Sequence, residues 1–501
     1  MSVHSFTIYD LYKRNAQLYK DKTAILSGDT RVTFGDLWDQ VIALAGELSS
    51  RGVSKGDRIA LLTKNSPAFM TILGAAAALG AILVPINFRL TAGEISYILD
   101  DAEPVILLFD REYEELMAEL VSVFPPVSER IPFDSQQVSP FPMVDRRIFS
   151  EEVTASDPLV IIHTAAIQGK PRGAVISHGN LLAGMSQTVS VIGLDSGEIY
   201  LNILPLFHIF GLIMALSLMQ VAGKNIIISK FDPKEVNEII QQKKVSIVAN
   251  FPPILSQILD EQKKGGFDLS SLRHVVGLEH PDTIARYIGL GFGQFWLCYG
   301  QTETMALTCL SRHQERPGSA GRPVPWVDMA IVDEFDRPVD RGKPGEIVLR
   351  GPLVFSGYWK EEELTQMTFR GGWHHTGDLG RLDTDGFLWF MGRKAQKELI
   401  KSGGENVYPV EVEKAIMEHP AIEEASVIGV PDPKFGEGIK AVCVLRPGAK
   451  VTEQELTAFV ASKIASYKKP RIVRFVDSLP KKADSSINRE EVKALYGQSL
   501  V

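Results

Sequence analysis

The sequence predicts an α/β protein in which a large N-terminal domain of doubly covered, mainly parallel sheets precedes a small, mobile α+β C-terminal domain. Two observations support this fold class. Between residues 58 and 300, short runs rich in Val, Ile and Leu alternate with helix-length segments. Such alternation is typical of βαβ units, whose parallel sheets are covered on both faces. Beyond residue 317, Gly and Pro become dense, which predicts antiparallel strands with tight turns that form a distorted barrel.

Each predicted strand is a short apolar run. The runs assigned to strands are 58–63, 81–86, 105–109, 159–164, 225–229, 245–250 and 295–300. Helical spacing of apolar residues predicts helices over 232–243 and 281–290. Residues 70–88 carry no charge, but they are rich in Ala and Gly and are interrupted by Pro85. We therefore expect a buried helix and a strand there, because a membrane span needs ~20 strongly apolar residues.

The domain boundary is predicted where a charged stretch, KAQKELIK (394–401), follows Gly392-Arg393. Residues 1–393 would form the N-terminal domain and residues 394–501 the C-terminal domain, with a hinge near 394–398. The last ~110 residues are enough for a small domain of their own.

Composition excludes several classes of protein. The formal net charge of −8 argues against a nucleic-acid-binding protein. The three cysteines, Cys298, Cys309 and Cys443, lack C-x-x-C spacing, so neither a disulfide framework nor a zinc site is expected. A reducing cytoplasm is the expected compartment. The N-terminus has no apolar signal segment, and no integral membrane segment is predicted.

A glycine-rich turn with two cations follows the run at 159–164. Gly169 and Gly173 alternate with Lys170 and Arg172 in the segment QGKPRG. Backbone N–H groups in such a turn can face an anion, and the cations add attraction. A basic surface turn would have the same sequence pattern. This segment alone therefore does not distinguish a phosphate-binding loop from such a turn.

This segment resembles the phosphate loop of the superfamily of acyl-CoA synthetases, adenylation domains and luciferases, usually YTSGTTGxPKG followed by xxxTHxN. The matching residues are Thr164, Gly169, Pro171, Gly173, His178 and Asn180. Similar segments follow in order along nearly the whole chain: ALGAILVPINFRL (78–90), LPLFHIFGL (204–212), YGQTET (299–304), PGSAGRP (317–323), GEIVLRGPLVFSGYW (345–359), WHHTGDLG (373–380), DGFLWFMGR (385–393), SGGENVYPVEVE (402–413) and SYKKPRIVRFVDSLPK (466–481). The chain is thus identified as a member of this superfamily, which implies ATP or AMP, Mg²⁺ and CoA as ligands.

The resemblance also implies roles at the nucleotide. Thr302 would hydrogen-bond the α-phosphate and Glu303 would bind Mg²⁺, although this pair also suits an ordinary helix N-terminus. Tyr299 would stack on the adenine side, while Asp378 and Arg393 would hold the ribose. The nucleotide-binding residues implied are Thr164, Gly169, Lys170, Arg172, Gly173, Tyr299, Gly300, Gln301, Thr302, Asp378, Arg393 and Lys397. The catalytic residues implied are His208, Thr302, Glu303 and Arg172.

For the acid and the thiol, the resemblance points to other segments. A lone histidine in an apolar run is often a core residue, but the resemblance places His208 beside the reacting carboxylate. The acyl pocket implied contains His208, Asn250, Phe251, Gly277, Leu278 and Tyr299. These residues include no base for a second carboxylate, so a monocarboxylic acid is expected. The residues implied for CoA are Lys401, Gly403, Gly404 and Glu405, since glycine lets pantetheine approach closely. His374 and His375 should not share a metal, because adjacent strand residues face opposite ways.

Three segments depart from the family pattern. Residues 165–168 lack the usual hydroxyls, GLEHP (277–281) replaces the adenine-side turn, and Ser486 replaces the lysine that bridges carboxylate and α-phosphate. Losing such a donor typically costs ~10²–10³ in rate. Two explanations stay open. A compensated synthetase would use extra cations, Lys170 with Arg172 at the loop and Lys481 or Lys482 at the tail. Alternatively, the protein would work mainly on the thioester side, for instance from acyl-CoA and AMP towards acyl-AMP.

The expected function is that of an AMP-forming acyl-CoA synthetase, an acid–thiol ligase whose small domain rotates between two half-reactions. Acid and ATP would give acyl-AMP and pyrophosphate, and CoA would then displace AMP. Two alternatives stay open: a ligase that loads a carrier-protein thiol, and a degenerate homologue that binds acyl-AMP or acyl-CoA without productive adenylation. The chain length of the acid, the physiological direction and the formation of a homo-oligomer are also open.

Overall fold

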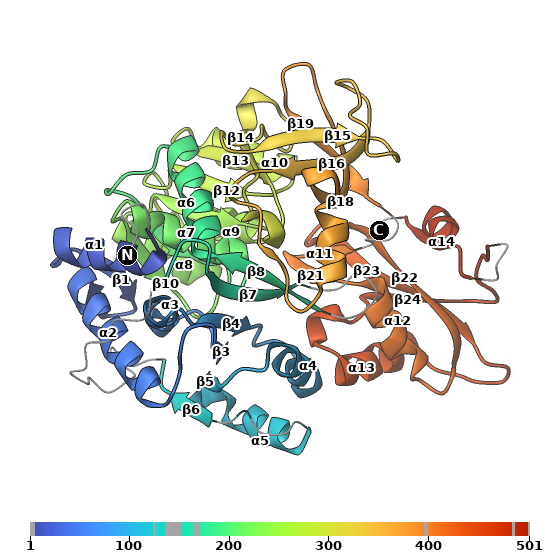
Figure 1. The fold of residues 1–501 in the computed structure, drawn as a ribbon. Coiled ribbons are helices and arrows are strands. Elements are labelled where there is room, and N and C mark those ends of the chain that lie inside the picture. Colours follow the sequence, from blue (N-terminus) through green and yellow to red (C-terminus); the bar gives the residue numbers. More distant parts are fainter. Residues whose placement is uncertain are drawn as a thin grey trace.

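The computed structural model describes residues 6–123, 127, 129–135, 153–164, 171–394, 399–482 and 486–498. We call residues 6–394 the large part and residues 399–498 the small part. Figure 1 shows the small part, orange to red, at one side of the molecule and next to the blue helix α4 (Ala92–Ala102) of the large part.

Two mainly parallel sheets form most of the large part. The eight-stranded sheet runs in the order β14 (Cys309–Arg312), β13 (Gln294–Tyr299), β12 (His274–Gly277), β11 (Ile247–Asn250), β9 (Ile199–Asn202), β10 (Lys224–Ile227), β1 (Thr23–Ser27) and β2 (Thr30–Thr33). The seven-stranded sheet runs in the order β17 (Gly357–Tyr358), β8 (Arg172–Ser177), β7 (Pro158–Thr164), β4 (Ile82–Ile86), β3 (Arg58–Leu62), β5 (Ile106–Asp110) and β6 (Glu129–Phe133). All seven predicted strands are confirmed within one or two residues at their ends.

A third sheet of the large part is antiparallel. It runs in the order β15 (Asp328–Val332), β16 (Gly345–Arg350), β18 (His374–Leu382) and β19 (Leu388–Arg393). The change of pairing after residue 317 is therefore confirmed, but the structure has a four-stranded sheet with edges at β15 and β19 in place of the expected barrel. The chain leaves this sheet between β16 and β18 to form β17 of the seven-stranded sheet and then α11 (Glu362–Thr368).

The small part has its own sheet and core. Its strands are β20 (Ile400–Ser402), β21 (Glu405–Val407), β22 (Ile422–Asp432), β23 (Gly436–Leu445) and β24 (Ile472–Val476). An apolar cluster that includes Val412, Ile416 and Val460 packs helices of this part against the sheet. The separation into two parts agrees with the predicted fold class, while the exact boundary at 393/394 stays a prediction.

Helices cover the sheets of both parts. In addition to α4 they are α1 (Ile8–Leu18), α2 (Phe34–Ser50), α3 (Pro67–Leu79), α5 (Glu114–Val123), α6 (His178–Ile192), α7 (Ile209–Gln220), α8 (Pro233–Lys243), α9 (Ile254–Gly265), α10 (Pro281–Gly289), α11 (Glu362–Thr368), α12 (Pro409–Met417), α13 (Glu453–Lys463) and α14 (Arg489–Tyr496). The two helices expected at 232–243 and 281–290 are α8 and α10. Among the described residues, no helix combines the length and apolar character that crossing a membrane requires.

Local sequence explains where the key helices begin. Every residue of α3 is buried, as its uncharged Ala-rich sequence predicts for a helix inside the protein. Helix α4 begins with a capping box, in which Thr91 and Glu94 satisfy each other's backbone N–H groups. This cap fixes the Glu94 side chain at the start of α4, where it faces the small part.

Candidate active site

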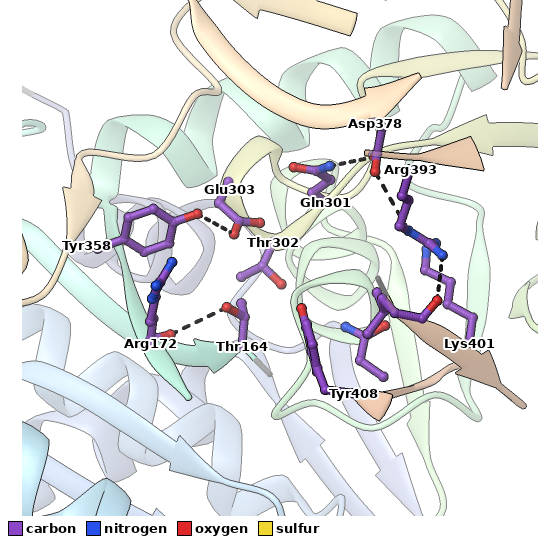
Figure 2. Close-up of a pocket in the computed structure, with 13 residues that line it drawn as sticks. Thr164, Arg172, Gln301, Thr302, Glu303, Tyr358, Asp378, Arg393, Lys401 and Tyr408 are labelled. Atoms are coloured by element: carbon purple, nitrogen blue, oxygen red, sulfur yellow. Dashed lines mark hydrogen bonds and ion pairs between the residues drawn. The ribbon is translucent and has the colours of Figure 1, made fainter. Parts of the chain in front are cut away.

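One pocket lies where the large and small parts meet (Figure 2). The large part contributes Thr164, Arg172, Gly300, Gln301, Thr302, Glu303, Tyr358, Asp378 and Arg393 to its lining. The small part contributes Leu399, Lys401, Asn406 and Tyr408. The pocket therefore joins the facing ends of β7 and β8, the segment after β13, strand β17, the β18–β19 pair and the region of the β20–β21 hairpin.

Strand ends position Thr164 and Arg172 at the pocket. Thr164 ends β7 and Arg172 begins β8, and the two residues are register partners in this antiparallel pair. Gly169 and Lys170, predicted to bind phosphate, lie outside the described residues. Gly173 lies within β8 rather than in the pocket lining, and a Cβ there would come within 2.6 Å of the Ile161 side chain. The structure thus places the cation Arg172 at the pocket and gives Gly173 a packing role.

Thr302 and Glu303 lie on a short 3₁₀ helix, Thr302–Thr304, that follows β13. Gly300 precedes it, and a Cβ at that position would lie 2.1 Å from the Ala306 carbonyl oxygen. Only glycine therefore allows this tight turn. The alternative of an ordinary helix capped by Thr302 is wrong, because the helix is a single 3₁₀ turn whose N-cap is Gln301. This turn brings Thr302 and Glu303 to the pocket.

A second corner of the pocket is built around Asp378. Its Oδ2 accepts hydrogen bonds from the Tyr299 hydroxyl at 2.8 Å and from Gln301 Nε2 at 2.6 Å. Arg393, the register partner of Asp378, has its Nε 3.6 Å from Oδ1. Asp378 Oδ1 and Gln301 Oε1 are buried and have no hydrogen-bond partner among the described residues. This corner offers acceptors to a ligand that brings hydroxyl groups.

Tyr299 lies behind this corner rather than in the pocket lining. It is buried, its ring packs 6.2 Å from that of Phe390, and desolvation together with Asp378 raises its pKa well above the ordinary value. It therefore stays protonated and orients Asp378. Stacking of Tyr299 on an adenine remains a prediction.

Four of the residues predicted for the acyl group, Asn250, Phe251, Gly277 and Leu278, lie at the carboxyl ends of β11 and β12. Asn250 Nδ2 donates to the Leu278 carbonyl at 2.7 Å, which joins the two strand ends. A Cβ at Gly277 would lie 1.9 Å from the Asn250 carbonyl oxygen, so glycine is required there. Phe251 follows β11 and packs edge-on against Phe210 at 5.5 Å.

The glycine turn of the small part docks on this same region. A Cβ built on Gly404 would be 3.1 Å from the Phe251 ring, and one on Gly403 would be 3.6 Å from the Pro252 carbonyl oxygen. Glu405 follows this turn and contacts His208 Nε2 at 3.1 Å and Arg89 Nη1 at 2.8 Å. The residues predicted for the acid and for CoA are thus neighbours, which the sequence could not establish.

Charge at the contact between the two parts is balanced. Desolvation alone would raise the pKa of Glu405, but His208, Arg89 and Lys468 hold it below the usual value. Desolvation and the charge of Arg393 lower the pKa of Lys401, which lines the pocket. Lys401 therefore lies near the corner built around Asp378, while its predicted role toward CoA stays a prediction.

The predicted hinge region is described only in part. Lys397 lies outside the described residues. Lys394 is tied to the large part, because its Nζ lies 2.6 Å from Glu346 and its N–H donates to the Gly377 carbonyl. Residue 394 is thus held by the large part in this arrangement, and Lys397 stays the predicted hinge residue.

His374 and His375 face opposite ways, as expected for neighbours in a strand. His374 packs 5.5 Å from the Phe355 ring, whereas His375 Nδ1 lies 3.0 Å from Glu346. Asp336 completes a group of three possible metal ligands with Glu346 and His375. Arg370 contacts both acids of this group, so their charge is already balanced by the protein.

Some pocket residues had no role assigned from the sequence. Asn406 and Tyr408 belong to the matching segment SGGENVYPVEVE, and Tyr358 belongs to GEIVLRGPLVFSGYW. The matches of these two segments to the family motifs were the only sequence features that could have pointed to these three residues as part of the site. Their contacts depend on the packing of distant segments, which motif spacing does not reveal.

Comparison with known proteins agrees with this geometry. Residues 12–359 match the model of the AMP-binding enzyme family, and residues 411–485 match that of the AMP-binding enzyme C-terminal domain. A feruloyl-CoA synthase of Amycolatopsis sp is 35% identical over 97% of this chain and 98% of its own. A 2-succinylbenzoate–CoA ligase of Bacillus thuringiensis subsp. konkukian is 32% identical over 98% of both chains. The structure of o-succinylbenzoate CoA synthetase from Bacillus subtilis superposes with a TM-score of 0.86, at 27% identity and with 97% of this chain and 98% of that chain covered.

The chain therefore belongs to the AMP-binding enzyme family, the adenylate-forming acyl-CoA synthetases. Enzymes of this class are acid–thiol ligases that use ATP and CoA, and the chain is a ligase of this kind.

Proposed function

We propose that this ligase activates a monocarboxylic acid as an acyl-adenylate in the pocket of Figure 2 and then transfers the acyl group to CoA. One observation carries the proposal. Two buried acceptors that have no hydrogen-bond partner among the described residues, Asp378 Oδ1 and Gln301 Oε1, share the pocket with the cations Arg172 and Arg393, and Arg393 Nε lies 3.6 Å from Asp378 Oδ1. Such acceptors suit the donor hydroxyls of a ribose, and the cations suit a phosphate, so the lining would be complementary to AMP.

The residues of this chain divide the work. Asp378 would hold the ribose, and Arg172 and Thr302 would attract the α-phosphate as pyrophosphate leaves. Glu303 fits the expected Mg²⁺, because it is a buried carboxylate in the pocket lining and a hard oxygen ligand. When bound, that ion would neutralise phosphate charge, and the protein's contribution is to place Glu303 and Arg172 around it.

The acid would lie between the acceptor corner and the docked glycine turn. His208, Asn250, Phe251 and Leu278 surround this region, and Gly403 and Gly404 close it from the small part. The absence of Cβ atoms at both glycines leaves room for a thin pantetheine arm. The walls are mainly apolar, which favours an acid with a single carboxylate. The names of the relatives make acids with an aromatic ring good first candidates.

The adenylation step depends on how the position of Ser486 is compensated. Ser486 does not line the pocket, and its carbonyl accepts a hydrogen bond from Lys482 N–H at 2.8 Å across a hairpin closed by the Lys481–Ile487 pair. Residues directly opposite in an antiparallel pair project to the same side. The side chains of Lys482 and Ser486 therefore project from the same face of the hairpin. Lys481, which precedes Lys482 in the chain, forms an ion pair with Glu424 instead. We favour Lys482, with Arg172 in the pocket and Lys170 in the adjoining turn, as the source of the missing charge.

The test compares two half-reactions. Acid-dependent exchange of labelled pyrophosphate into ATP would be measured across short, long and aromatic acids, beside acyl-CoA formation from pre-made acyl-AMP. Exchange with one acid class and rapid thioester formation are the expected results. Thioester formation without exchange would mean an enzyme that works from acyl-CoA and AMP. Nucleotide binding without either reaction would contradict the proposal and favour a degenerate homologue.

The acyl acceptor needs a separate arm of the same experiment. Free CoA and a carrier protein with its phosphopantetheine arm would be offered in parallel to the same acyl-AMP. We expect turnover with free CoA. A clear preference for the carrier protein would mean that the acyl acceptor is a carrier-protein thiol rather than CoA. The proposal for the adenylation step would not be affected.

A further inference from the structure

Tyr358 is a pocket residue to which the reaction above assigns no task. Its hydroxyl lies 2.9 Å from Glu303 Oε1, and because a carboxylate can only accept, the phenol is the donor. Figure 2 shows the Tyr358 ring beside Arg172, with its hydroxyl directed to the Glu303 carboxylate. Glu303 is 7% exposed, so this contact is shielded from competing solvent.

The segment that carries Tyr358 holds Glu303 at two points. The Phe355 N–H donates to the Glu303 carbonyl oxygen at 2.9 Å, and three residues later the Tyr358 hydroxyl donates to the carboxylate. The Phe355 ring also packs edge-on against the Tyr358 ring at 4.8 Å. Backbone and side chain of Glu303 are therefore restrained by one short stretch of chain.

This stretch is itself anchored on the phosphate side of the pocket. Strand β17 pairs with β8, with Tyr358 opposite Ala174. The Ser356 N–H donates to the Val175 carbonyl at 2.9 Å, and the Trp359 N–H donates to the Gly173 carbonyl at 2.8 Å. Because β8 begins at Arg172, the segment that holds Glu303 is also anchored on the strand that carries this cation.

We propose that Tyr358 is the positioning residue of Glu303: its hydroxyl fixes Oε1 so that Oε2 faces the pocket to receive a divalent cation. Among the described residues, no hydrogen bond engages Oε2, while Oε1 is held by Tyr358. A carboxylate with one oxygen anchored presents the other in a single orientation and loses little freedom on binding. This inference rests on the proposed function, since it assigns the cation to the nucleotide site.

The test is Tyr358→Phe, which removes one oxygen atom and keeps the ring. Binding of Mn²⁺ to the enzyme with ATP, but without acid, would be followed by electron paramagnetic resonance. We expect the Mn²⁺ affinity to fall on the order of tenfold, as is typical when a partner of a metal ligand is removed. AMP binding without metal, measured by calorimetry, should stay unchanged.

A matched control exists in Tyr200→Phe. Tyr200 is fully buried and its hydroxyl has no partner among the described residues, so this variant also loses a phenol oxygen but leaves Glu303 alone. It should bind Mn²⁺ like the parent enzyme. Glu303→Gln should lose most Mn²⁺ binding, which shows that the signal comes from this site.

Two outcomes separate the inference from the function on which it rests. If the parent enzyme binds Mn²⁺ with ATP and Tyr358→Phe binds it equally well, the positioning role is wrong and the nucleotide site stands. The role is equally wrong if metal-free AMP binding falls together with Mn²⁺ binding, because the hydroxyl would then support the whole pocket. If the parent enzyme binds neither AMP nor Mn²⁺ with ATP, the proposed function itself fails.

Discussion

The small part presents two turns whose surroundings differ completely. The turn at Gly403 and Gly404 lies against Phe251 and Pro252, and the residue after it makes buried contacts with His208 and Arg89 of the large part. The hairpin that contains Lys482 and Ser486 contributes nothing to the pocket lining, and its Lys481 pairs with Glu424 within the small part.

Under the proposed function, this difference would assign the present orientation to the thioester step. The glycine turn would guide a thiol to the acyl group, while the hairpin that would supply charge for adenylation does not line the pocket. Each face of the small part would therefore affect one step, and single substitutions should separate the two steps.

The largest effect is expected for Lys482→Ala. If Lys482 supplies the charge missing at Ser486, pyrophosphate exchange should fall by about 10²–10³, the typical loss for one preorganised donor. Acyl-CoA formation from pre-made acyl-AMP should not change. Lys481→Ala is the matched control and should leave both rates near those of the parent. Equal exchange in the two variants would exclude Lys482 as the substitute.

A somewhat smaller effect is expected for Gly404→Ala. The backbone φ of +88° already strains any side chain, and the added methyl group would press on the Phe251 ring at 3.1 Å. Misplacement of the turn should slow thioester formation by about 10²-fold and spare pyrophosphate exchange. Gly448→Ala tests the strain alone, because Gly448 has φ +79° and open space at its Cβ. A comparable loss in both variants would mean that backbone strain, not docking, is responsible.

A moderate effect is expected for Lys468→Met. Lys468 is buried, with its Nζ 2.5 Å from Glu94 of α4 and bonded to Glu411 of α12, so it links the two parts. Removing it leaves two acids facing each other, which weakens the present orientation. Water can enter the parted contact, so the energetic loss should be smaller than the ~3–5 kcal/mol that is typical when one partner of a fully buried ion pair is removed. We therefore expect thioester formation to fall only about tenfold.

The control for this variant is Lys463→Met, whose exposed ion pair with Glu418 lies within the small part. Small-angle scattering adds a reading independent of activity, since the Lys468→Met enzyme should depart from the profile calculated for the present orientation. An unchanged profile with unchanged thioester formation would show that this ion pair does not hold the two parts together.

The smallest effect is expected from pH. The pKa of Glu405 is held below its usual value, so its contacts with His208 and Arg89 are fully formed above about pH 4.5. They are lost only as the pH falls through the lower pKa of the folded enzyme. Thioester formation should therefore lose a Glu405-dependent contribution only below that range. Glu405→Gln should lack this decline, and identical acid limbs for both proteins would contradict the assignment.

Sequence alone was sufficient for most of the secondary-structure elements. Apolar runs predicted the strands because parallel strands are buried on both faces, and motif order predicted that Thr302, Glu303, Asp378 and Arg393 belong to one site, whose pocket all four residues line. Motifs did not reveal which side chains line that pocket, since burial is not encoded in a motif. Tyr299 lies behind Asp378 and Gly173 packs against Ile161, while the roles assigned to both residues stay predictions.

Only the tertiary structure decided which distant groups touch. The Tyr358–Glu303 contact joins residues 55 positions apart, and the Lys468–Glu94 contact joins residues 374 positions apart. Local patterns determine helices, strands and turns because those depend on neighbours in the chain. Hydrogen bonds and ion pairs across a domain contact depend on packing angles and burial, which the whole fold sets. The sequence by itself thus determined the class of enzyme, and the fold decided how its carboxylates are oriented and which face of the small part meets the pocket.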